Sequence, residues 1–188
     1  MRQYFLQGDK AGLRGLARED VDGNWFSWFN DRRVVKYMFN GSYPNTREGL
    51  LDFYETRCVN NPGHLVLAIE DLETGTHVGN IGLHEINQLY RRAELGIVIG
   101  ETGFWGRGIG GEACRLICDH GFARLNLHKV YLRTEAENVG AIRAFERAGF
   151  AREAVLRDEI YRDGAYRDSA YMSRFSPYDE PLAGEDGR

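Results

Sequence analysis

The sequence predicts an α+β fold, with a mixed, mostly antiparallel twisted sheet of about six to seven strands flanked by helices. Three observations lead to this fold class. Apolar residues recur near a helical period in the first third of the chain, the period changes to two after residue 63, and strands alternate with helices after that. A length of 188 residues suits a single domain, which we place at residues 1–175.

The first third of the chain is expected to be helical. Apolar side chains between Val21 and Met38 are interrupted at Asn30-Asp31, which indicates two short helices joined by that polar pair. Thr46 is placed to cap a further helix over residues 47–59. The Asn60–Gly63 segment then ends that helix in a turn.

The rest of the chain is expected to supply the sheet. Strands are expected at residues 65–69, 77–86, 93–99, 129–133, 154–161 and 166–175. Helices are expected over residues 111–124 and 138–148, and Gly149 would end the second of them. Asp163-Gly164 is a strong hairpin signal between the last two strands. Residues 176–188 are rich in Pro, Gly and acid, and we expect a disordered acidic tail there.

The composition excludes several classes of partner. A net charge of −4, from 24 basic and 28 acidic residues, supplies no field that would recruit nucleic acid. No apolar run approaches the roughly 20 residues that span a membrane, and the N-terminus lacks a signal-peptide pattern, so we expect a cytoplasmic protein. Three cysteines without a CxxC pair indicate neither disulfides nor a metal site, and Cys114 and Cys118 have the spacing of packing residues on one helix face.

A glycine-rich loop is the strongest functional signal. It follows an apolar strand, opens a helix and consists of Gly106, Arg107, Gly108, Ile109, Gly110 and Gly111. Glycines let the backbone approach a ligand closely, and a helix N-terminus presents unpaired N–H groups, so the expected guest is a phosphate. The Lys-Ser or Lys-Thr of a Walker loop is missing. The G-x-G-x-x-G spacing of dinucleotide folds is present, but five residues separate it from a strand that belongs to a hairpin.

Two motifs together resemble the Gcn5-related N-acetyltransferase (GNAT) family. The segment from Trp105 to Gly110 is similar to the family's [Q/R]-x-x-G-x-[G/A] loop, with Trp in place of the usual first residue. That departure resembles the branch that acetylates ribosomal-protein N-termini (Rim type) and its amino-sugar relatives. A second motif, N-x-x-[A/S]-x-x-x-[Y/F]-x-x-x-G-[F/Y], is filled by Asn138, Ala141, Phe145, Gly149 and Phe150. The resemblance covers nearly the whole chain and implies the GNAT fold.

The resemblance implies that the co-substrate is acetyl-CoA and that no metal is needed. The loop N–H groups would hold the pyrophosphate, and the pantetheine arm would pair like an extra strand with Val98, Ile99 and Gly100. Asn138 would contact the arm or a water, and Arg143 would reach the adenosine 3′-phosphate. Each of these two residues also has a simpler interpretation, as a helix cap and as a solvated surface cation.

Two carboxylates are candidates for the base that takes the proton from the attacking amine. Glu94 lies six residues before Gly100, which matches the catalytic glutamate of histone-acetylating members, although it would serve equally well as the partner of a surface arginine. Glu85, at the end of the preceding strand, is the second candidate. Family members often carry a Tyr or Glu as an acid where this chain has Phe145 and Arg133. The acid would then be a water or a tyrosine such as Tyr131, or none would be needed, since a thiolate is a tolerable leaving group.

The acceptor is open at this point. The aromatic pattern of the first third is similar to acetyltransferases of amino-sugar synthesis, so a nucleotide-linked amino sugar and a ribosomal-protein N-terminus are expected before a polyamine or an antibiotic amine. Trp25, Trp28 and Phe29 are at helical spacing and are expected in the core. Two other functions are considered, a non-catalytic acyl-CoA-binding sensor and a dinucleotide-binding oxidoreductase. Many relatives are dimers, and a homodimer is possible.

Overall fold

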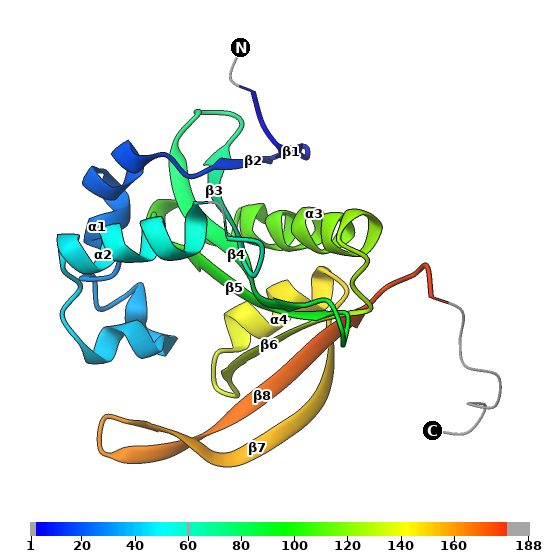
Figure 1. Ribbon diagram of the computed structural model, residues 1–188. Helices are drawn as coiled ribbons and strands as arrows, with labels where there is room; N and C mark the ends of the chain where they lie inside the picture. Colours follow the sequence, from blue (N-terminus) through cyan, green and yellow to red (C-terminus); the bar gives the residue numbers. More distant parts are fainter. Residues whose placement is uncertain (1–2, 60, 180–188) are drawn as a thin grey trace, which may run out of the picture.

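A computed structural model describes residues 3–59 and 61–179 of the chain. Within them, eight strands form one sheet in the order β1-β2-β3-β4-β5-β6-β8-β7 (Figure 1). The strands are β1 Leu6–Gln7, β2 Ala11–Gly15, β3 Leu65–Asp71, β4 His77–Asn87, β5 Arg92–Ile99, β6 Lys129–Glu135, β7 Ala151–Arg162 and β8 Ala165–Phe175. Every neighbouring pair is antiparallel except β5 and β6, which are parallel. The mixed, mostly antiparallel sheet that the sequence predicts is confirmed.

The first third of the chain is not purely helical, because β1 and β2 precede the first helix. Ala11 and Leu13 alternate into the core with no exposed surface, and β2 pairs with β3 along its whole length. Their alternation is hard to see in the sequence because Gly12 and Gly15 lower the intrinsic strand preference of the segment. Pairing with β3 decides the structure here. The expected six to seven strands are therefore eight in the described part of the chain.

The helices of the first third are shorter than the sequence indicates. The segment consists of a 3-10 helix Arg18–Asp22, α1 Asn24–Trp28, 3-10 helices Val35–Tyr37 and Phe39–Ser42, α2 Arg47–Phe53 and a π turn Tyr54–Cys58. The helix expected after Asn30-Asp31 is thus only a 3-10 turn. Thr46 caps α2 as predicted, since its hydroxyl accepts a hydrogen bond of 3.1 Å from the N–H of Gly49.

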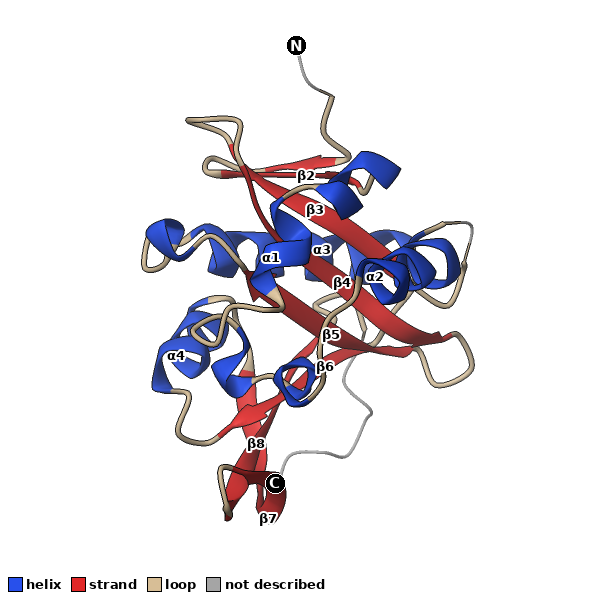
Figure 2. Ribbon diagram, turned by 90° about the vertical axis from the view of Figure 1, so that its left-hand side faces the viewer, coloured by secondary structure: helices blue, strands red, loops and turns tan. Residues whose placement is uncertain are grey.

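Two helical layers cover opposite faces of the sheet (Figure 2). The main core lies between the sheet and α3 Ile109–Arg124 with α4 Val139–Arg147, while α1 and α2 cover the other face with Trp25, Trp28 and Leu50. Trp25 and Trp28 are buried, as the sequence predicts. Cys114 and Cys118 lie in the main core and are at most 1% exposed, which confirms their packing role.

The last two strands form a long hairpin that extends away from the helical layers (Figure 1). Its turn is Asp163-Gly164, with positive φ at both residues as a two-residue hairpin turn requires. The strands are longer than predicted, and β7 forms the edge of the sheet. Residues 180–188 of the expected tail lie outside the described residues, whereas Asp179 accepts hydrogen bonds from Arg91 and His128.

Candidate active site

The strands β5 and β6 run together for only three residue pairs and then part. The pairs are Arg92 with Lys129, Ala93 with Val130 and Glu94 with Tyr131. Beyond Glu94, β5 keeps its partner β4, but its other edge has no strand partner among the described residues. A parted edge of this kind can accept an extended ligand as an additional strand. Glu94 marks the point at which the opening begins.

The free edge contains Val98, Ile99 and Gly100, the segment expected to pair with the pantetheine arm. One backbone carbonyl on this edge already has a partner, because the indole N–H of Trp105 donates to the Ile99 carbonyl oxygen at 2.7 Å. Gly100 has a packing reason to be glycine, since a Cβ there would lie 1.9 Å from the ring of Trp28. Trp28 in turn donates to the carboxylate of Glu101 at 2.9 Å. The contacts of Trp28 therefore hold helix α1 directly against the end of β5.

The glycine loop leads from this edge into α3. Gly106 and Gly108 have φ values of +76° and +87°, which favour glycine, and Gly108 is the residue that precedes the first helical turn. A Cβ on Gly111 would lie 3.5 Å from the carbonyl oxygen of Ala144, so the start of α3 packs closely on α4. No side chain caps α3, and the N–H groups of its first turn are therefore available to an anion.

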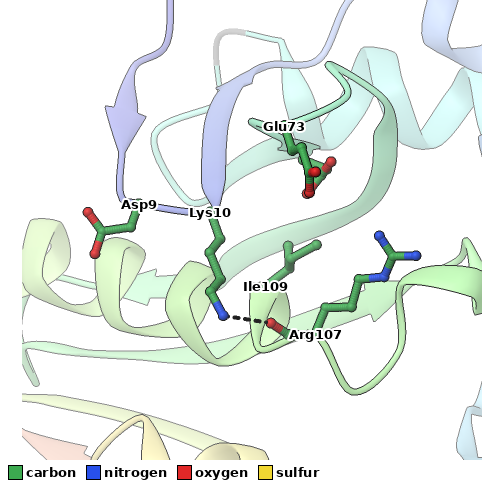
Figure 3. Close-up of a pocket in the computed structure, with 6 residues that line it drawn as sticks. Asp9, Lys10, Glu73, Arg107 and Ile109 are labelled. Atoms are coloured by element: carbon green, nitrogen blue, oxygen red, sulfur yellow. Dashed lines mark hydrogen bonds between the residues drawn. The ribbon is translucent and has the colours of Figure 1, made fainter.

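Figure 3 shows the outer side of this loop. The Nζ of Lys10 donates to the Arg107 carbonyl at 3.1 Å, which braces the loop against the β1–β2 turn, while the Arg107 guanidinium points away from that bond. A cavity of about 220 Å³ lies here, and its lining includes the acidic residues Asp9 and Glu73 as well as the two cations. The mixed charge does not favour a phosphate in this cavity. The expected phosphate site is therefore the row of backbone N–H groups.

Asn138 and Phe145, from the second motif, both have structural roles. The Asn138 side chain caps α4, accepting from the N–H of Ala141 at 3.4 Å, and its amide donates to the Thr134 hydroxyl at 3.1 Å. Phe145 is buried, with its ring edge-to-face on that of Phe150. Arg143 is exposed on α4, and in the part of the chain that the structure describes it has no ion pair. Contacts of Asn138 and Arg143 with a co-substrate remain predictions.

A β-bulge brings the two candidate carboxylates to one face of the sheet. Leu83 and Ile86 both pack into the main core, so His84 and Glu85 must both lie on the opposite face, where Glu94 is the partner of His84. The register confirms one extra residue on β4, and φ of Glu85 is +50°. Glu85 is exposed. Bulges of this kind commonly redirect side chains beside active sites.

Tyr131 is the β6 partner of Glu94 and lies within electrostatic range of Glu85. Burial raises the pKa of its hydroxyl, and the negative charges of Glu94 and Glu85 raise it further. Its ring stacks on that of Tyr171 at 5.3 Å. A tyrosine whose pKa is raised is protonated at neutral pH, so Tyr131 has a proton available to donate.

Glu94 also has the surface partner that the alternative interpretation requires. The guanidinium of Arg133 lies 3.4 Å from its carboxylate, and Arg133 also lies 3.8 Å from Glu159. The side chain of Glu94 is 27% exposed and that of Arg133 is 50% exposed. Exposed pairs of this geometry are weak, so the contact leaves Glu94 accessible to a substrate.

A cavity of about 200 Å³ lies between the α1–α2 layer and the sheet, beside the parted edge. Its lining is aromatic and uncharged, and it includes Phe29, Phe53, Asn80, His84, Gly96 and Val98. No carboxylate belongs to the lining as described. The side-chain amide of Asn80 lies 2.8 Å from Nε2 of His77, so it already has a hydrogen-bond partner within the protein. This cavity is the candidate acceptor site.

Two histidines of this region were not predicted as site residues from the sequence. The Nδ1 atoms of His64 and His84 lie 3.3 Å apart, and the guanidinium of Arg57 lies 2.9 Å from Nε2 of His64. Burial, together with the charges of His64 and Arg57, lowers the pKa of His84 to about 4. Burial and Arg57 also lower the pKa of His64. Neither residue belongs to a recognisable motif, and only the fold brings them together.

Glu112, in the first turn of α3, is the other missed residue. Its buried carboxylate accepts the backbone N–H groups of Asp9, Lys10 and Ala11 at 2.7–3.1 Å. Burial alone would raise the pKa of Glu112, but these three hydrogen bonds hold it below its usual value. Glu112 therefore links the β1–β2 turn by hydrogen bonds to α3, the helix that begins at the glycine loop.

A sheet with one parted parallel pair, next to a glycine-lined helix start, can hold an extended ligand that carries a phosphate. The model of the GNAT acetyltransferase domain matches residues 10–151. The chain therefore belongs to the GNAT acetyltransferase family and is an acyltransferase enzyme. This membership overturns the dinucleotide-binding oxidoreductase considered above.

Several relatives have names that describe their substrates. The spermidine N(1)-acetyltransferase of Escherichia coli strain K12 is 34% identical over 141 residues, which cover 75% of this chain and 73% of the relative. YdaF of Bacillus subtilis, a proposed ribosomal N-acetyltransferase, is 30% identical over 128 residues, covering 66% of this chain and 68% of the relative. The crystal structure of the Vibrio cholerae spermidine N-acetyltransferase with CoA and spermine is 28% identical, has a TM-score of 0.80 and covers 90% of this chain and 97% of that one.

No helix among the described residues is long and apolar enough to cross a lipid bilayer.

Proposed function

We propose that this enzyme transfers the acetyl group of acetyl-CoA to a primary amine by direct attack on the thioester. The observation that carries the proposal is the parting of β5 from β6 immediately before the glycine-lined start of α3. The loop N–H groups would bind the pyrophosphate, and the free edge of β5 would orient the pantetheine arm. Holding the thioester beside the amine supplies much of the rate.

The chemistry removes two protons from the ammonium nitrogen and returns one to the leaving thiolate. An ammonium has no lone pair, so a base must first take its proton, and Glu94 is the proposed base with Glu85 as the second candidate. The neutral amine then attacks the carbonyl carbon, a C–N bond forms, the C–S bond breaks and a thiolate leaves. The base releases the first proton to solvent and then takes the second proton, which the nitrogen loses as the amide forms. Tyr131, the strand partner of Glu94, is the proposed donor to the thiolate, with water as the alternative.

The acceptor is proposed to be an amine with little positive charge besides the reacting group. Support comes from the uncharged, aromatic lining of the cavity between the α1–α2 layer and the sheet. A nucleotide-linked amino sugar and a ribosomal-protein N-terminus both fit this description. A polyamine is the second candidate, because relatives are named spermidine N-acetyltransferases.

The test is an assay of CoA release with acetyl-CoA and a panel of amines. The panel contains nucleotide-linked amino sugars, peptides with the N-termini of ribosomal proteins, spermidine and aminoglycosides. We expect release with at least one of them and acetylation of its amine by mass spectrometry. Tight binding of acetyl-CoA without release for any amine would instead establish the non-catalytic acyl-CoA sensor. No binding of acetyl-CoA would overturn both.

A further inference from the structure

Two glycines form a niche that holds an imidazole in the acceptor cavity. Gly82 of β4 and Gly96 of β5 lie directly opposite one another in the ladder. A Cβ on Gly82 would lie 2.8 Å from Nε2 of His84, and a Cβ on Gly96 would lie 3.1 Å from the same atom. The ring of His84 therefore lies over both glycines, and the sheet has no side chain there that would displace it.

The hydrogen bonds of the histidines fix where the proton of His84 resides. A guanidinium is only a donor, so Nε2 of His64, 2.9 Å from Arg57, must accept. The ring proton of neutral His64 is then on Nδ1, and it is donated to Nδ1 of His84 at 3.3 Å. The proton of His84 is consequently on Nε2, the atom over the glycine pair. No residue in the described ranges accepts from this N–H.

The same network keeps His84 uncharged at neutral pH. Burial is the largest cause of its lowered pKa, and the charges of His64 and Arg57 act in the same direction, while Glu85 opposes them. His64 also has a lowered pKa. His84 is therefore a fixed donor in the cavity rather than a base that would compete with the carboxylates.

We propose that His84 is a specificity-determining residue, whose Nε2–H donates a hydrogen bond to an oxygen of the acceptor close to the reacting amine. The inference rests on the proposed function and names the acceptor class: an amine that carries a neighbouring hydroxyl or carbonyl oxygen. A second ammonium at this place would bring a donor against a donor, because an ammonium has no lone pair. As described, the cavity lining contains no carboxylate, and Glu85 and Glu94 on the same face are the candidates for the base at the reacting amine. An amino sugar and a peptide N-terminus both supply the required oxygen, and a polyamine does not.

The test compares two acceptors that differ in a single group, 3-amino-1-propanol and 1,3-diaminopropane. The wild-type enzyme is expected to have the higher kcat/KM with the amino alcohol. His84→Ala should reduce that preference about tenfold, the value of one buried hydrogen bond, while KM for acetyl-CoA stays the same. His84→Gln places an amide N–H near the same position and should restore most of the preference. His120→Gln is the matched control, because His120 lies on α3, where its ring packs on Phe5, and it does not line the cavity.

A spectroscopic measurement tests the tautomer without turnover. The 15N shifts of the imidazoles should show His84 neutral and protonated on Nε2 at pH 7. Arg57→Ala removes the donor that fixes the tautomer of His64, so a larger fraction of His84 should be protonated on Nδ1 in that variant. A charged ring, or a proton on Nδ1, would overturn the inference. So would an unchanged preference in His84→Ala when that variant binds acetyl-CoA normally. Failure of the wild-type protein to bind acetyl-CoA would overturn the proposed function and the acceptor role with it.

Discussion

At the scale of single residues, the base of the reaction can be tested because two carboxylates share one face of the sheet. Glu94→Gln and Glu85→Gln keep the size of each side chain and remove its ability to accept the proton. A general base contributes on the order of 100-fold or more, so we expect one variant to lose about that factor in kcat. KM for acetyl-CoA should stay the same, because neither side chain lies on the glycine loop. Steady-state kinetics with the best amine of the panel measures both constants.

Glu146→Gln, on the exposed face of α4, is the control for this pair. It removes a carboxylate of the same type from a place remote from the parted strands and should leave kcat unchanged. Full activity in both Glu94→Gln and Glu85→Gln would mean that water alone accepts the proton, and the assignment of either residue would then be wrong.

Glu112 is expected to affect the stability of the folded protein rather than the catalytic rate. Its pKa is lower in the folded protein than the ordinary glutamate value of about 4.3, so it contributes stability that is fully present above pH 4.3. That contribution is lost as the pH falls through the folded pKa. Glu112→Gln should cost about 2 kcal/mol at pH 7, since a charged acceptor of three backbone N–H groups is removed, and should flatten the loss of stability in acid.

Urea unfolding between pH 3 and pH 7 measures this effect, with Glu146→Gln as the control. If Glu112→Gln and the wild-type protein lost stability in parallel below pH 4.3, the three hydrogen bonds would not be the source of the lowered pKa. The variant should also bind acetyl-CoA more weakly if the β1–β2 turn supports the loop, because Lys10 of that turn bonds the Arg107 carbonyl.

At the scale of elements, Gly106 of the glycine loop and Gly103 of the 3-10 helix Thr102–Phe104 just before it differ in backbone conformation. A Cβ on Gly103 or on Gly106 would meet nothing within 4 Å, but only Gly106 has a positive φ, of +76°. Gly106→Ala should therefore cost about 1 kcal/mol of stability, the strain of a left-handed residue with a Cβ. It should also raise KM for acetyl-CoA several-fold as the loop shifts. Gly103→Ala should do neither. Thermal unfolding and acetyl-CoA titrations compare the two, and equal effects would contradict a role for the loop conformation.

Elements with strong local patterns were predictable from the sequence, and those set by tertiary contacts were not. The helix after the glycines follows from the helical spacing of its packing residues, the hairpin at Asp163-Gly164 follows from turn chemistry, and both are in the structure. The strand Ala11–Gly15 was missed because its glycines conceal the alternation that β3 enforces. The candidate site divides in the same way. The loop and the carboxylates were found from motifs and spacing, whereas the one-residue bulge that aligns Glu85 with Glu94 leaves no signal in the sequence.

At the scale of the whole molecule, the binding of acetyl-CoA should be visible as stability. A ligand that binds only the folded state adds about 2.7 kcal/mol at a concentration of 100 times its Kd. For a domain of this size that corresponds to a rise in Tm of roughly 5–10 °C. Acetyl-CoA should produce this shift, and NADH at the same concentration should not. A shift with NADH and none with acetyl-CoA would contradict the assignment of the glycine loop.

The buried cysteines of α3 allow the same linkage to be measured inside the core. Burial raises the pKa of Cys114 to about 12, and Cys118 beside it is also raised well above the ordinary value, so both thiols are inert unless the helix separates from the sheet. Reaction with a thiol reagent at pH 8 should therefore be slow in the folded protein and rapid in urea.

Because α3 begins at the phosphate-binding loop, saturating acetyl-CoA should slow the labelling of Cys114 and Cys118 further, about 100-fold at 100 times its Kd if opening requires release of the ligand. Cys58, in the π turn after α2, is the internal comparison, and mass spectrometry resolves the three sites. Equal protection of Cys58 would show that the ligand resists only global unfolding, whereas selective protection of the α3 thiols would show that the loop and its helix open as one unit.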